Sequence, residues 1–173
     1  MTRKLPEVMK EEEVLKLFQY TFTPHHKLVM MFMYYCGLRV SEAINLSTDD
    51  IDLKDSTLMV KSGKGGKDRL VPIPKPMMQA YKDFIKLYKP EGKIFTFGKR
   101  SVHYMVKRQG AKIGKPTIHP HTLRHSYATH ILKKTNNLKL VKDLLGHESI
   151  ATTQIYTHLD TTTKQANIKK IWG

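Results

Sequence analysis

Cysteine is almost absent from this chain of 173 residues, and its single copy, Cys36, has no partner for an internal disulfide. A chain of this length buries roughly 70% of the surface that its unfolded form exposes, so it can fold without such a cross-link. Cys36 lies in the apolar run LVMMFMYYCGL, which favours a small buried side chain over a reactive thiol. The shortage of cysteine fits a reducing, intracellular setting.

Long apolar stretches are absent too. The longest runs from Leu28 to Cys36 and is too short to cross a bilayer. The chain starts MTRKLPEVMKEEE, with charges and without the apolar segment of a secretory signal. We therefore expect a soluble, cytoplasmic protein that does not bind a membrane.

Acidic residues become scarce after residue 60. Residues 61–173 hold 23 Lys or Arg against 6 Asp or Glu, residues 1–60 hold 7 against 9, and the net charge is +15. A basic field of this strength attracts polyanions, nucleic acid above all. Because 24 of the 30 basic residues are Lys, a solvated lysine-rich surface remains an alternative. Charge alone also does not separate an enzyme from a passive binder.

The first 50 residues show the spacing of helices. KEEEVLKLFQY predicts a helix with an acidic first turn and one apolar face, made of Val14, Leu15, Leu17 and Phe18. A second helix is expected from Pro24 to Cys36, with proline at its start and Gly37 at its end. Ser41 is expected to cap a short third helix, SEAINL.

The pattern then changes to that of strands. Residues 51–74, IDLKDSTLMVKSGKGGKDRLVPIP, alternate short apolar runs with turn residues, and a further short strand is expected around Ile94 to Phe97. Helical patterns return from Lys75 on, in PKPMMQAYKDFIKLY, RSVHYMVKRQGAKIG, HTLRHSYATHILKK, LKLVKDLLG, IATTQIYTH and TTTKQANIKKIW. We predict one domain, residues 1–173, of the α+β class: mostly helical, with a small antiparallel three-stranded sheet on one side.

Six polar residues stand at unusual places in these patterns: Arg39, Lys64, His121, Arg124, His147 and Tyr156. Each has an ordinary explanation when taken alone, such as a surface pair of Arg39 with Glu42 or a solvated turn lysine at Lys64. As a set they suit the breaking of a phosphodiester. Guanidinium groups offer paired donors and fixed charge to phosphate oxygens, and histidines donate to them or move a proton at neutral pH. A lysine in a glycine-rich hairpin can approach and protonate a leaving oxygen, and nearby cations make a tyrosine hydroxyl easier to ionise.

Other chemistries fit less well. SGKGGKD lacks the spacing of a nucleotide-binding phosphate loop. His121 and His125 have the i, i+4 spacing of zinc ligands, but the residue after His121 is Thr122 rather than the glutamate of zinc proteases. Asp49, Asp50 and Asp52 lie at a polar strand entry, where exposure to solvent is expected rather than a magnesium site.

In these motifs the sequence resembles the tyrosine recombinase (phage integrase) family, most closely its Xer-like members, over nearly the whole chain. GLRVSEAINL is similar to the first box of the family, with its arginine at Arg39 and a supporting acidic residue at Glu42. GKGGKDRLVPIP is similar to the hairpin that carries the active lysine, here Lys64. The remaining boxes, HPHTLRHSYATH and LLGHESIATTQIYTH, place the other four residues at His121, Arg124, His147 and Tyr156.

The resemblance implies a strand exchange on double-stranded DNA through a 3′-phosphotyrosyl link to Tyr156, without metal, nucleotide or other cofactor. It implies that two arginines and a histidine hold the phosphate, that Lys64 is the general acid, that His121 assists proton transfer and that Glu42 orients the first box. Two alternatives stay open: relaxation of DNA as by a type IB topoisomerase, and a non-catalytic DNA-binding module.

Two further expectations concern the ends of the chain. Family members usually carry an N-terminal helical domain that closes around DNA, and this sequence begins where that domain would already have ended. At the other end, Ile168, Ile171 and Trp172 form an apolar face in residues 162–173. This segment either docks on a neighbouring copy, giving a homo-oligomer on DNA, or folds back on its own domain.

Overall fold

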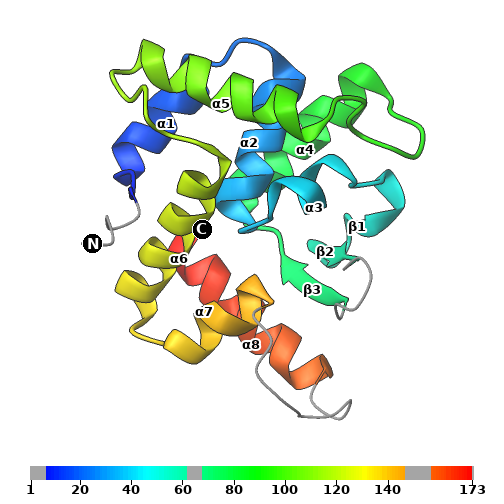
Figure 1. The fold of residues 1–173 in the computed structure, drawn as a ribbon. Coiled ribbons are helices and arrows are strands. Elements are labelled where there is room, and N and C mark those ends of the chain that lie inside the picture. Colours follow the sequence, from blue (N-terminus) through cyan, green and yellow to red (C-terminus); the bar gives the residue numbers. More distant parts are fainter. Residues whose placement is uncertain (1–6, 62–67, 147–156, 173) are drawn as a thin grey trace.

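The computed structural model describes residues 7–61, 68–146 and 157–172, and only the backbone of 157–163. The described residues form mostly helices and one small sheet, which confirms the predicted fold class (Figure 1). The helices are α1 (Glu11–Gln19), α2 (Pro24–Tyr35), α3 (Val40–Ile44), the 3-10 helix η1 (Thr48–Asp50), α4 (Lys75–Tyr88), α5 (Lys99–Lys112), α6 (Pro120–Thr135), α7 (Leu138–Leu145) and α8 (Thr157–Trp172). The strands are β1 (Ile51–Asp52), β2 (Thr57–Val60) and β3 (Arg69–Pro72).

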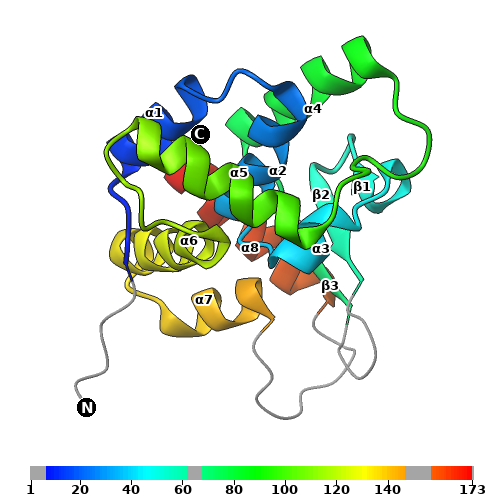
Figure 2. The same cartoon turned by 45° about the horizontal axis from the view of Figure 1, so that its top comes forward.

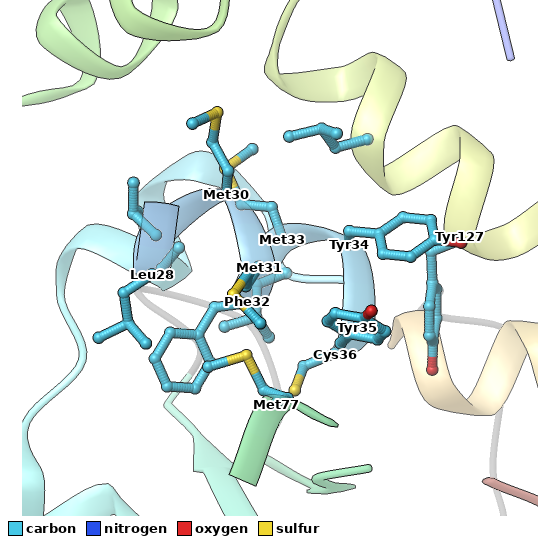
Figure 3. Close-up of a cluster of buried hydrophobic side chains, with 14 of the residues drawn as sticks. Leu28, Met30, Met31, Phe32, Met33, Tyr34, Tyr35, Cys36, Met77 and Tyr127 are labelled. Carbon is cyan, nitrogen blue, oxygen red and sulfur yellow. The ribbon is translucent and has the colours of Figure 1, made fainter. Parts of the chain in front are cut away.

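Helix α2 is the centre of the core. Every residue from Leu28 to Tyr35 is buried, because α1, α4, α5 and α6 pack around this helix (Figures 1 and 2). Figure 3 shows its side chains with Met77 of α4 and Tyr127 of α6. Cys36 is fully buried at the end of α2, as predicted, and burial raises the pKa of its thiol. Among the described helices, none is both long and apolar enough to cross a bilayer.

The three strands form one antiparallel sheet in the order β1-β2-β3. Leu58 of β2 pairs with Val71 of β3, and Val60 pairs with Arg69. The prediction of an additional strand at residues 94–97 is wrong. The chain makes only an isolated bridge there, between Ser47 and Lys93, and the consecutive residues 94 and 95 are both buried instead of alternating.

Three local expectations need correction. Leu15 is 50% exposed, because the apolar face of α1 follows the i, i+3, i+4 spacing of its other members. Ser41 does not cap α3: the helix begins at Val40, and the Glu42 carboxylate accepts from the amide that precedes the helix. Asp50 is buried rather than exposed, and its carboxylate lies 2.5 Å from Nζ of Lys61.

Helix α8 folds back on its own domain. It packs against β3, α4 and α6, as the red helix in Figure 1 shows. Ile168 is buried at 2% exposure, and the Gln165 amide donates to the carbonyl of Asp55 at 2.8 Å. The ring of Trp172 meets Tyr34 edge-on, and Lys134 places its ammonium 4.5 Å from the ring centre. The separate helix expected in IATTQIYTH lies mostly outside the described residues.

Candidate active site

The structure brings three of the predicted site residues together: Arg39, Glu42 and Arg124. His121 lies one turn before Arg124, at the start of α6. Lys64, His147 and Tyr156 lie outside the described residues.

Glu42 is the centre of this cluster. Its side chain is only 8% exposed, although it belongs to the short helix α3. Its Oε2 accepts a hydrogen bond of 2.7 Å from the amide of Arg39, and its Oε1 accepts one of 3.0 Å from Nη1 of Arg39. The pairing of Arg39 with Glu42 therefore exists, but the carboxylate is buried and only the arginine, at 42% exposure, reaches solvent.

Arg124 approaches the same carboxylate from the first turns of α6. Its side chain is 9% exposed, and Nη1 lies 3.7 Å from Oε2 of Glu42. It also donates to the carbonyl of Gly37 and, at 2.8 Å, to that of Leu145. Burial, followed by the positive charge of Arg39, lowers the pKa of Arg124 to about 10, so the group stays protonated at neutral pH.

A third arginine, Arg69, also contacts Glu42 and was not among the predicted site residues. It is the first residue of β3. Its Nη1 lies 2.8 Å from Oε1 of Glu42, and its Nη2 lies 2.9 Å from Oε2. One signal could have revealed it. Arg69 and Val71 stand two residues apart on a strand and so share a face, and a charged residue on the apolar face of a strand needs a buried partner.

This cluster holds more positive than negative charge. Burial opposes ionisation of Glu42, but hydrogen bonds from Arg69 and from the Arg39 amide outweigh it, so the pKa of Glu42 lies below its ordinary value. One carboxylate therefore faces three guanidinium groups, and a positive excess remains. An always-protonated, partly exposed arginine in such a field is suited to hold phosphate oxygens.

His121 is exposed at the surface beside this cluster. Partial burial, followed by the charges of neighbouring histidines and Arg124, lowers the pKa of His121. The ring is therefore neutral at pH 7 and able to accept a proton. Within the described residues, no group of three or more His, Cys, Asp or Glu side chains gathers in a way that could hold a metal ion.

Residues 7–163 match the model of the phage integrase family. A tyrosine recombinase of Thermosipho africanus is 41% identical over 98% of this chain and 63% of its own length. The chain thus spans less than two thirds of the length of this relative.

Solved structures agree with this match. The crystal structure of XerA recombinase superposes with a TM-score of 0.78 at 30% identity, over 95% of this chain and 64% of that one. XerH site-specific recombinase, bound to palindromic difH substrate in a post-cleavage complex, superposes with a TM-score of 0.69 at 27% identity, over 94% of this chain and 52% of that one. A buried glutamate held by three arginines thus lies in a fold shared with recombinases, and the chain belongs to the tyrosine recombinase (phage integrase) family.

Proposed function

We propose that residues 1–173 form the catalytic unit of a site-specific DNA recombinase that cuts and rejoins DNA through Tyr156. The observation that carries this proposal is the arginine cluster. Arg39, just before α3, and Arg124, in α6, converge on one buried carboxylate although they are far apart in the sequence, and Arg39 remains open to solvent. Family membership and the likeness to XerA and XerH support the same activity.

In the proposed reaction, the hydroxyl oxygen of Tyr156 attacks a phosphorus atom of the DNA backbone. A bond forms between this oxygen and phosphorus, and the bond from phosphorus to the 5′ oxygen of the next nucleotide breaks. His121, neutral at rest, takes up the tyrosine proton, and Lys64 gives a proton to the departing 5′ oxygen. The products are a 3′-phosphotyrosyl link and a free 5′-hydroxyl.

The phosphate itself is held by Arg39, Arg124 and His147 in this proposal. Negative charge grows on its non-bridging oxygens during attack, and fixed donors that face those oxygens lower the barrier, each being worth about 10² to 10³ in rate. A 5′-hydroxyl from a second strand then attacks the phosphotyrosyl link and reverses the step. The covalent link conserves the energy of the broken bond, so strand exchange requires no nucleotide.

Double-stranded DNA is the proposed substrate. Residues 61–173 carry 23 basic and 6 acidic residues. Lysine and arginine side chains bind the phosphates of DNA, and the affinity of such binding falls steeply as the salt concentration rises. The XerH structure, held with its difH substrate after cleavage, supports a DNA substrate for this chain as well.

We further propose that copies of the chain assemble on DNA, with residues 162–173 as the segment that joins them. Helix α8 packs on its own domain in this structure, so exchange requires that its contacts with β3 and α6 open first. Removing residues 162–173 should then abolish self-association on DNA. Unchanged self-association after this deletion would reject the proposal.

The decisive experiment captures the covalent intermediate. The protein is incubated with a pool of nicked duplexes in which the short fragment with the free 5′-hydroxyl diffuses away after cleavage, and adducts are separated by denaturing electrophoresis. We expect an adduct with the unchanged chain and none with Tyr156→Phe, while DNA binding persists. Tyr104→Phe is the matched control, since its ring is 67% exposed on α5 and it should form the adduct normally.

The DNA recovered from the adduct distinguishes the alternatives. A recombinase enriches one sequence from the pool. A topoisomerase-like enzyme gives adducts without enrichment and relaxes supercoiled plasmid at no preferred site. A passive binder retains DNA in a salt-sensitive manner and gives no adduct at all, and that result would overturn the proposed function.

A further inference from the structure

We propose that Arg69 is a positioning residue of the strand-cleavage reaction: it neutralises Glu42 and fixes the end of α7, so that Arg39 and Arg124 stay free for the phosphate. This inference rests on the proposed function. Arg69 does not belong to the set of residues for which that function assigns a contact with DNA.

The three arginines share the hydrogen bonds to Glu42 unevenly. Arg69 covers both carboxylate oxygens, with Nη1 at 2.8 Å from Oε1 and Nη2 at 2.9 Å from Oε2. Arg39 gives this carboxylate one side-chain bond of 3.0 Å, whereas Arg124 stands 3.7 Å away. Arg69 is thus the principal partner of the carboxylate, and the partly exposed Arg39 keeps donors that face solvent.

The ion pair of Arg69 with Glu42 is buried. The side chains of Arg69 and Glu42 are 10% and 8% exposed, so the pair is shielded from water. A buried charge that loses its partner must find another. Without Arg69, the carboxylate would draw Arg39 and Arg124 inward, and the positive charge available to a phosphate would fall.

Arg69 also contacts the end of α7. Nε of Arg69 donates to the carbonyl of Leu144 at 3.3 Å, and Arg124 donates to that of Leu145 at 2.8 Å. The last carbonyls of a helix have no partner within it, so these bonds tie the end of α7 to the arginine cluster. His147 follows Gly146 directly in the sequence.

The close approach of Gly146 to Arg69 supports this link. Gly146 has a φ of +65°, and a Cβ placed on it would lie 2.8 Å from Cδ of Arg69. Only glycine allows the backbone to lie so near the arginine stem. Arg69 therefore connects three segments: the strand β3 to which it belongs, the helix of Glu42, and the helix α7.

Four variants test the proposal in the complete chain: Arg69→Gln, Arg69→Lys, the double variant Glu42→Gln with Arg69→Gln, and the control Lys16→Gln. Lys16 is exposed on α1, so its variant removes the same charge away from the cluster. The measurements are the rate of adduct formation in a single turnover at saturating nicked DNA, the dissociation constant for DNA, and the thermal unfolding midpoint.

We expect Arg69→Gln to lower the single-turnover rate by about 10-fold to 100-fold, less than the loss of a direct donor to the phosphate. The dissociation constant for DNA should change as little as in Lys16→Gln. Arg69→Lys should restore only part of the rate, because an ammonium cannot bind both carboxylate oxygens as a guanidinium does. The double variant should cleave faster than Arg69→Gln, since removing the charge of Glu42 releases the other two arginines.

The outcomes separate the two proposals. If the unchanged chain forms no adduct, the proposed function fails and this inference fails with it. If the unchanged chain forms the adduct, and Arg69→Gln and Arg69→Lys cleave at the rate of Lys16→Gln, only the role of Arg69 is rejected. The role is also rejected if the double variant cleaves no faster than Arg69→Gln, or if the lost rate equals the lost fraction of folded protein.

Discussion

The ring of Tyr127 lies directly against the backbone of Gly37, so closely that a Cβ on Gly37 would stand 2.5 Å from Cε1 of the ring. This contact brings the turn after α2 onto α6. The carbonyl of Gly37 is one of the groups to which Arg124 donates. The same contact therefore helps to hold Arg124, which lies near the start of α6, beside Glu42.

Replacing Gly37 by alanine should destabilise the protein for two reasons. Its φ of +63° is unfavourable for residues with a side chain, and the new methyl group would collide with the Tyr127 ring. Gly92→Ala is the matched control, since Gly92 has a φ of +70° but nothing within 4 Å of its Cβ position. We expect Gly37→Ala to lose about 1–3 kcal/mol more free energy of unfolding than Gly92→Ala, as for an overpacked core. Urea unfolding measures both values, and equal losses would mean that the close contact carries no energetic cost.

The stability of the protein should fall when the pH is lowered from 7.5 to 5.5. Burial is the largest cause that lowers the pKa of four histidines, namely His26, His121, His125 and His130. A histidine with a lowered folded pKa takes up its proton first in the unfolded chain, so the unfolded chain binds more protons below about pH 6.5. The lowered pKa values of Glu13 and Glu42 act in a more acidic range, below the ordinary carboxylate value of 4.5.

His130 allows this prediction to be assigned to a residue. It is 6% exposed, and its Nδ1 lies 2.8 Å from the hydroxyl of Tyr34. His130→Gln should reduce the dependence of the free energy of unfolding on pH, whereas the exposed His103→Gln should leave it closer to that of the unchanged chain. Urea titrations at pH 7.5, 6.5 and 5.5 give the slope. A protein that became more stable toward pH 5.5 would contradict the prediction.

Trp172 should anchor α8 to its own domain. Its ring centre lies 5.3 Å from that of Tyr34 and 5.1 Å from that of Tyr35, both edge-on. Trp172→Ala should lower the free energy of unfolding by up to about 3 kcal/mol. This is the low end for truncation of a large aromatic side chain, because the ring is only partly buried. Leu87→Ala is the control, since Leu87 is 71% exposed on α4.

Calorimetry at several protein concentrations completes the test of α8. If α8 packs within one chain, the unfolding midpoint does not depend on protein concentration in the absence of DNA. A midpoint that rises with concentration, and a Trp172→Ala variant that loses this rise, would instead indicate exchange of the helix between copies.

The sequence by itself determined the class of the fold and the order of most of its helices and strands. These depend on local periodicity and on turn residues, and both were present: Gly37 ends a helix at positive φ, as its position in the pattern predicted. The motifs also indicated Arg39, Glu42 and Arg124 as one group, because the resemblance to a family adds spatial information that periodicity lacks.

Only the tertiary structure decided which residues meet. Arg69 stands 27 residues from Glu42 and 75 from Leu144, and no local pattern states that these three come into contact. For the same reason, Asp50 became buried beside Lys61, and Trp172 of α8 met the ring of Tyr34. A local pattern specifies that a side chain is apolar or charged, but the partner that buries or neutralises it depends on the path of the whole chain.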